Sequence, residues 1–157
     1  MMIGDDIPSE TARSDAYAAL ITILRSEDLQ PHNELLMVAH ALACCAVALG
    51  ADETLARSLV RVRYQQVSKR SPPGKRPPRP DGGLTLPSAD DFKRIALGLT
   101  EWLDGAKVPP HNQVWLLSHM LCELGWSFAV DLPYLDELVR DRFAAAAAWG
   151  KIYRGLQ

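Results

Sequence analysis

The four histidines of this 157-residue chain form two pairs, and the members of each pair stand 79 positions apart. In one pair, His40 is followed four residues later by Cys44, and His119 is followed by Glu123. Residues i and i+4 share a helix face, and imidazole, thiolate and carboxylate groups all bind transition metals. One hypothesis is therefore a metal site made of these four side chains. We favour the alternative, in which both histidines are neutral core residues with hydrogen-bond partners.

The second pair belongs to a Pro-His-Asn triplet that occurs twice, at 31–33 and 110–112. As functional residues, His32 with Asn33 and His111 with Asn112 would offer an imidazole and an amide from two loops to one ligand. As structural residues, the prolines would fix the start of a helix and the asparagines would cap it. We favour the structural interpretation, because a duplication preserves structural residues as readily as functional ones.

No sequence pattern of a known catalytic machinery is present. The chain has no Gly-x-Ser-x-Gly elbow, and its glycines lack the spacing of a phosphate-binding loop. Its three cysteines, Cys44, Cys45 and Cys122, lie in apolar sequence, which does not lower a thiol pKa. We predict a non-catalytic protein without a cofactor.

Positive charge is concentrated in one segment. Residues 54–80 contain no acid and eight bases, namely Arg57, Arg61, Arg63, Lys69, Arg70, Lys75, Arg76 and Arg79. These cations could contact a protein partner, with Pro77 to Pro80 as a Pro-x-x-Pro sequence, or the phosphates of a nucleic acid. The third interpretation is a solvated linker that its charge keeps extended.

The first of these interpretations is the one we favour. The net charge of −2 and the scarcity of aromatic residues among the bases count against nucleic acid. We therefore predict a small helical interaction or regulatory protein whose partner is a macromolecule. The alternatives are a nucleic-acid-binding regulator that uses segment 57–79 and a metal-binding helical protein with His40 and His119 as ligands.

The elements that must position these residues come from a repeat. Sliding the sequence by 79 positions aligns both histidine pairs, and also Asp52 with Asp131, Arg61 with Arg140 and Leu20 with Leu99. Hydrophobic residues recur at helical spacing in each copy. We predict one all-α domain over 1–157, a helical bundle of about six helices. Two pseudo-symmetric three-helix repeats, about 9–66 and 88–153, are joined by a Pro-rich basic linker at 67–87.

Three apolar patterns locate the core. Residues 34–49 are apolar on every side and should form a central buried helix. In the following helix, Leu55, Leu59 and Val62 form one stripe that should face inward. In the second copy, we expect Phe92, Ile95, Ala96, Leu99 and Leu103 to face the core, and likewise Leu135, Leu138, Val139 and Phe143.

Cell compartment and oligomeric state are less constrained. No apolar run reaches the roughly 18 residues of a membrane span, and residues 1–10 contain no basic residue. With an odd number of cysteines, these features predict a cytoplasmic protein with no membrane partner. A homodimer anchored by Trp149 near the end of the chain is a further hypothesis.

Overall fold

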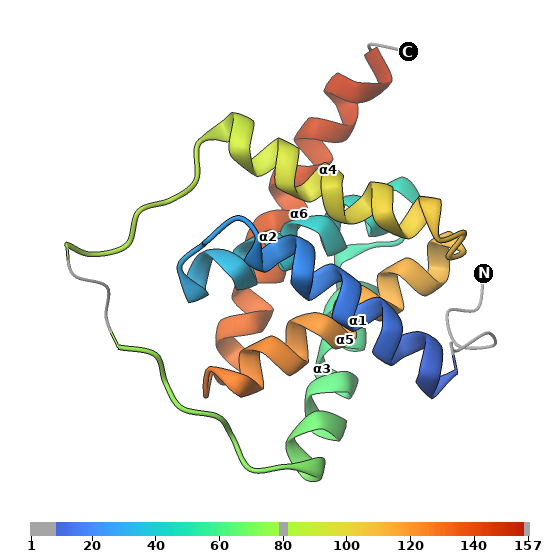
Figure 1. Cartoon of the computed structure of the whole chain (residues 1–157). Helices are drawn as coiled ribbons and strands as arrows, with labels where there is room; N and C mark the ends of the chain where they lie inside the picture. The colour runs from blue at the N-terminus through green and yellow to red at the C-terminus, as the bar shows by residue number, and fades with distance from the viewer. Residues whose placement is uncertain (1–8, 79–81, 156–157) are drawn as a thin grey trace.

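The computed structural model describes residues 9–78 and 82–155, with side chains up to residue 148. These residues form six helices and no strand, so the predicted all-α fold is confirmed. The helices are α1 (Glu10–Arg25), α2 (Pro31–Ala48), α3 (Glu53–Arg70), α4 (Ala89–Gly105), α5 (Pro110–Ser127) and α6 (Leu132–Gly155). A long connection between α3 and α4 leaves the helical body to one side (Figure 1).

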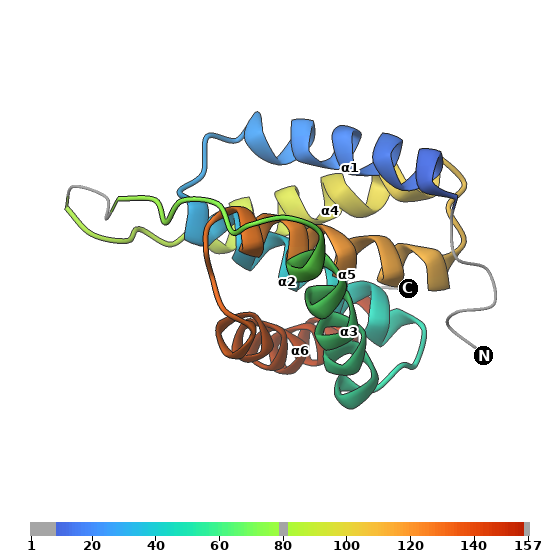
Figure 2. The same cartoon turned by 90° about the horizontal axis from the view of Figure 1, so that it is seen from below.

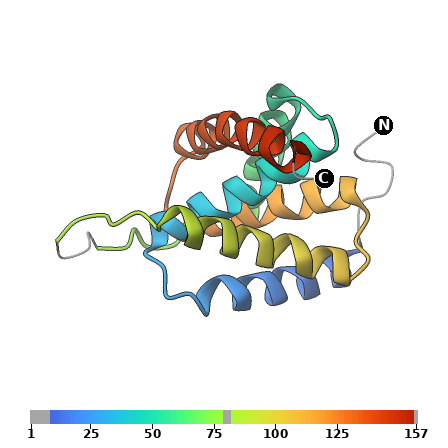
Figure 3. The same ribbon diagram turned by 90° about the horizontal axis from the view of Figure 1, so that it is seen from above.

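The helices lie in three layers. Helices α2 and α5 form the middle layer, α1 and α4 cover one face of it, and α3 and α6 cover the other (Figures 2 and 3). A middle layer covered on both faces has to be apolar all round. Its two helices accordingly carry most of the buried side chains of the protein.

The packing joins the two halves of the chain. Helix α6 packs mainly on α2, α3 packs mainly on α5, and α1 lies against α4. Contacts within α1–α3, or within α4–α6, are few by comparison. Neither half therefore has a core of its own, since each helix buries its apolar face against the opposite half.

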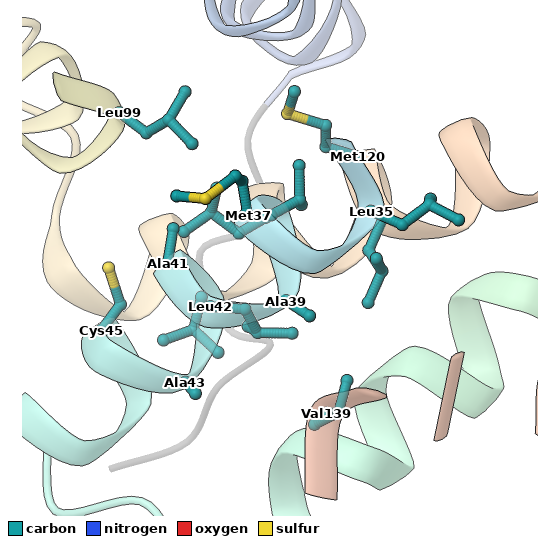
Figure 4. Packing of buried hydrophobic residues seen from close by; sticks show 14 of the residues in the cluster. Leu35, Met37, Ala39, Ala41, Leu42, Ala43, Cys45, Leu99, Met120 and Val139 are labelled. Atoms are coloured by element: carbon teal, nitrogen blue, oxygen red, sulfur yellow. The ribbon is translucent and has the colours of Figure 1, made fainter. Parts of the chain in front are cut away.

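Helix α2 is the centre of this core. Met37, Val38, Ala39 and Leu42 are completely inaccessible to solvent. Around the helix lie Leu99 of α4, Met120 of α5 and Val139 of α6 (Figure 4). The burial predicted for 34–49 is confirmed for 34–46, where only Cys44 is half-buried, whereas Ala48 near the end of the helix is exposed. The core-facing residues expected in α4 and α6 are also buried.

The inward face predicted for α3 was wrong. Its buried residues are Ala56, Val60 and Val67, whereas Leu55 and Val62 are 39% and 46% exposed. Apolar residues lie on two faces of this helix, and the face that contains the small Ala56 is the one buried. The helix continues to Arg70, and Val67 near its end is buried.

The ends of the helices follow the 79-residue spacing. Ser9 and Ser88 cap α1 and α4 by accepting a backbone N–H bond, and Asp52 accepts one at the start of α3. Asp28 and Lys107 both have positive φ after a helix end, as do Gly50 and Ala129. The starts of α4, α5 and α6 each lie 79 residues after those of α1, α2 and α3.

Candidate functional site

The connection between α3 and α4, residues 71–88 and called the strap below, is fastened to the helical body at its beginning. The indole Nε1 of Trp126 donates to the Ser71 carbonyl at 2.9 Å, and the Gly74 N–H donates to the Trp126 carbonyl at 3.0 Å. A Cβ on Gly74 would lie 1.9 Å from the Ser127 carbonyl oxygen. Only glycine permits this approach of two backbones.

The strap is fastened again near its end. Gln30 donates from Nε2 to the Gly83 carbonyl at 3.3 Å and accepts from the Thr85 N–H at 3.0 Å. Nδ2 of Asn33 donates to the Thr85 carbonyl at 2.6 Å. Asn33 is thus a residue of this tether and does not cap α2, whose N-cap position is Gln30 with Pro31 in the first turn.

The predicted cationic residues divide into two groups. Arg57 is held by Asp136 in a bidentate pair at 2.8 and 2.6 Å and lies 3.6 Å from Glu53, so it belongs to the packing of α3 on α6. Arg63 is half-buried, with its guanidinium 4.6 Å from the ring centre of Trp115. The exposed members are Arg61, Lys69, Arg70, Lys75 and Arg76, and Arg79 lies outside the described residues.

A cavity of about 650 Å³ opens beneath the strap, and it is lined by the start of α2, the α5–α6 turn and the strap itself. His32 lies at its wall, where its Nδ1 forms a hydrogen bond with the Tyr134 hydroxyl. Burial lowers the pKa of His32, which favours the neutral form of this ring. His111 and Asn112, the corresponding residues at the start of α5, are half-buried and do not line this cavity.

His40 lies fully buried in α2. Its ring contacts Phe92 edge-on with centroids 5.1 Å apart, and its Nε2 is 3.5 Å from the Cys44 sulfur. Burial, assisted by the nearby Arg142 charge, lowers the pKa of His40 to about 4. Burial raises the pKa of the Cys44 thiol to about 11. Both groups are therefore uncharged at pH 7.

His119 has a different environment. Its ring stacks on Trp115 with centroids 5.5 Å apart, and its Nε2 lies 3.4 Å from the Glu123 carboxylate. The pKa of His119 falls to about 4, first through burial and then through the charges of Arg13, Arg63 and Arg70. A neutral His119 can donate one hydrogen bond from Nε2 to Glu123.

The structure does not bring the predicted metal ligands together. His40 with Cys44 and His119 with Glu123 form two separate pairs on α2 and α5. Within the described residues, no three side chains of His, Cys, Asp or Glu are grouped closely enough to hold a metal ion. Burial also raises the pKa of Cys45 to about 12 and that of Cys122 further still, which keeps these thiols protonated.

A second cavity, of about 320 Å³, contains Arg13 and Tyr17, which the sequence did not single out. Arg13 and Tyr17 of α1 line it together with Arg70 of α3 and His119 of α5. Arg13 reaches the same indole as Arg63, at 5.2 Å from the centre of the Trp115 ring. Residues from three helices meet here, so no local spacing in the sequence could have predicted this cavity.

Comparisons with protein-family models, with curated proteins and with solved structures returned no match. In the part of the chain that the structure describes, no helix has the length and apolar character needed to cross a bilayer.

Proposed function

We propose that this chain is a non-catalytic helical binding protein that docks an acidic surface of a partner protein. The docking surface, called the cationic face below, consists of the exposed Arg61, Lys69, Arg70, Lys75 and Arg76 on α3 and the strap. The observation that carries the proposal is the tethering of the strap at both ends, through Gly74 and Trp126 and through Gln30 and Asn33.

The tethers matter because a free linker would lose conformational entropy on binding. Ordering one residue costs roughly 1–2 kcal/mol. The hydrogen bonds of Ser71 and Gly74 already fix the start of the strap on α5, next to Lys75 and Arg76. These cations are therefore presented on a partly ordered backbone, which lowers the cost of binding a partner.

Charge patterning favours an acidic partner. The described residues place no carboxylate in ion-pair distance of Arg61, Lys69, Arg70, Lys75 or Arg76. Exposed unpaired cations attract a surface of opposite charge and accelerate encounter with it.

A protein partner is favoured over nucleic acid by the state of Tyr64, an aromatic residue that lies between Arg61 and Lys69 on α3. Its hydroxyl donates to the Val130 carbonyl at 2.9 Å, and its ring packs edge-on against Trp126 at 5.6 Å. This ring is committed to the fold, so it is not available for stacking on a base. The net charge of −2 also counts against a nucleic acid as the partner.

We also propose that the scaffold is a duplicated three-helix unit with pseudo-twofold symmetry, in which each half completes the core of the other. Equal spacing of helix starts, caps and positive-φ residues supports this view. Arg57 and Asp136, which pair across the halves, are themselves 79 residues apart. Equivalent residues meet each other only next to a twofold axis.

The test is capture of partners from a lysate of the source cell on three immobilised baits. The baits are the wild-type chain, the charge reversal Lys75→Glu with Arg76→Glu, and the control Lys107→Glu, an exposed residue after α4. We expect the wild-type and control baits to capture proteins that stay bound after nuclease treatment. The bait with Lys75→Glu and Arg76→Glu should lose these proteins. Equal retention on all three baits contradicts it, and loss on nuclease treatment would favour nucleic acid.

A further inference from the structure

The cavity of about 320 Å³ between α1, α3 and α5, called the arginine pocket below, is lined mostly by polar side chains. Arg13, Ser14 and Tyr17 line it from α1, one turn or less apart, and Arg70 lines it from the end of α3. His119 and Glu123 form the wall on α5, with Glu10 completing the lining.

Three guanidinium groups lie at this pocket or next to it. Arg13 and Arg70 line it, and Arg63 lies over the ring of Trp115, on which His119 also stacks. In the described residues none of the three has a carboxylate in ion-pair distance. The Nε of Arg63 is buried and has no hydrogen-bond partner. Burial lowers the pKa of Arg63, and the charges of Arg13 and Arg70 lower it further.

The lining also contains two carboxylates, Glu10 and Glu123, and no described ion pair joins either of them to Arg13, Arg63 or Arg70. Glu123 lies 3.4 Å from His119, and its contact is to that ring instead of an arginine. Burial raises the pKa of Glu123, against the opposing effect of Arg70. Guanidinium groups that reach a concave site from two helices can bind an oxyanion, because each offers a planar fork of N–H donors.

We propose that the arginine pocket is a binding site for a phosphoryl group, either as free phosphate or as the end of a phosphate monoester. Arg13 and Arg70 would donate to its oxygens from two sides, because the planar fork of a guanidinium matches two oxygens of one phosphate. The hydroxyls of Ser14 and Tyr17 line the same space and supply neutral donors. Arg63 contributes positive charge from its position over the Trp115 ring.

A doubly charged tetrahedral group fits these observations better than a carboxylate. The guanidiniums come from two helices, α1 and α3, and a tetrahedral group directs oxygens toward both at once. A second negative charge on the ligand adds more attraction to Arg13, Arg63 and Arg70 than repulsion from Glu10 and Glu123.

This inference is independent of the proposed function, and the two can fail separately. Arg13 lies on α1, outside the cationic face, while Lys75 and Arg76 lie outside the arginine pocket. Arg70 alone belongs to both, so it is not used as a test position.

The experiment titrates inorganic phosphate, and in parallel phenyl phosphate, into the full-length chain. Binding is measured by calorimetry and by the NMR shift of the Trp115 indole N–H, because Trp115 contacts Arg13, Arg63 and His119. The proposal expects saturable binding below about 10 mM. If phosphate binds more tightly, the pocket is a site for the free ion. If phenyl phosphate binds more tightly, the pocket is a site for a monoester. Either result supports the proposal.

Variants give the test its direction. Arg13→Gln should weaken binding at least about tenfold, since it removes a charge-assisted contact. Glu123→Gln should tighten it several-fold, because a repelling carboxylate is lost. The control Lys107→Gln removes one positive charge, as Arg13→Gln does, but lies outside the pocket. The double variant Lys75→Glu with Arg76→Glu leaves the pocket intact. Both of these variants should keep a saturable response of Trp115 to phosphate.

Two results would overturn the proposal. One is the lack of a saturable response at Trp115 up to about 10 mM of either compound. The other is equal affinity in wild type, Arg13→Gln and Glu123→Gln. If Arg13→Gln does not fold, as judged by circular dichroism, the sign of the Glu123→Gln effect decides alone.

Discussion

Acidification should destabilise this protein through its two buried histidines. His40 and His119 have pKa values of about 4 in the folded chain. An unfolded histidine has a pKa of about 6.5. Between these values the unfolded chain binds more protons than the folded chain. Stability is therefore fully present above pH 6.5 and is lost as the pH falls toward 4.

The magnitude follows from these pKa values. On lowering the pH from 7 to 5, a histidine whose pKa is about 4 folded and about 6.5 unfolded costs about 2 kcal/mol of stability. Burial is the largest cause of both low pKa values, and the charges of Arg142 near His40 and of Arg13, Arg63 and Arg70 near His119 act in the same direction. Two such groups would remove a large fraction of the 5–15 kcal/mol that is typical of a domain.

The assay is urea unfolding at pH 7 and pH 5 for wild type, His40→Gln and the double variant with His119→Gln. His40→Gln loses the edge-on contact with Phe92, so its stability falls at both pH values. The quantity to compare is the difference in the free energy of unfolding between pH 7 and pH 5. Carboxylates that all variants share contribute equally to this difference. We expect His40→Gln to reduce that difference by about 2 kcal/mol, and the double variant by about twice as much.

If the free energy of unfolding of His40→Gln changes between pH 7 and pH 5 as much as that of wild type, this reasoning is refuted. Such a result would mean that His40 has the same pKa in the folded and the unfolded chain. Direct measurement of the His40 ring pKa by NMR gives an independent check. A value near 6.5 would contradict the burial on which the argument depends.

Three other perturbations test particular contacts. Ala129 has φ of +55°, so Ala129→Gly should stabilise the chain by about 1 kcal/mol in thermal unfolding. Gly50 has φ of +73° and no atom within 4 Å of an added Cβ, so Gly50→Ala should destabilise the chain by a similar amount through backbone strain alone. Gly74→Ala should detach the start of the strap, because its Cβ would lie 1.9 Å from the Ser127 carbonyl oxygen. Detachment would appear as faster amide exchange at residue 74 and a red shift of Trp126 fluorescence, while the helix content stays unchanged. Asp136→Arg should lower stability by roughly 1 kcal/mol and the added Arg57→Asp should restore it, whereas additive losses would contradict a direct pair.

Helical periodicity and turn residues were enough to predict the all-α fold and most of its helices. Local rules apply here: Ser9 and Ser88 cap helices, Pro31 and Pro110 start them, and uniformly apolar α2 lies at the centre. The error in α3 also has a local cause. Leu55 and Val62 made one apolar face, yet Ala56 and Val60 on another are buried.

The partition of the cations was not accessible from sequence. Arg57 and Arg63 look like Arg61, but one pairs with Asp136 of α6 and the other packs on Trp115 of α5. The tethers of the strap depend likewise on Trp126 and Gln30, far from it in the chain. Contacts between the two halves decide all of these features, and a one-dimensional pattern contains no information about which half faces which.

The central claim, that the cationic face is the docking surface, is tested most directly by lysine cross-linking of the captured complex followed by mass spectrometry. The lysines with described side chains divide cleanly: Lys69 and Lys75 lie in the cationic face, whereas Lys93 and Lys107 lie on and after α4. The account predicts links from Lys69 and Lys75 to acidic segments of the partner. Links confined to Lys93 and Lys107 would contradict it.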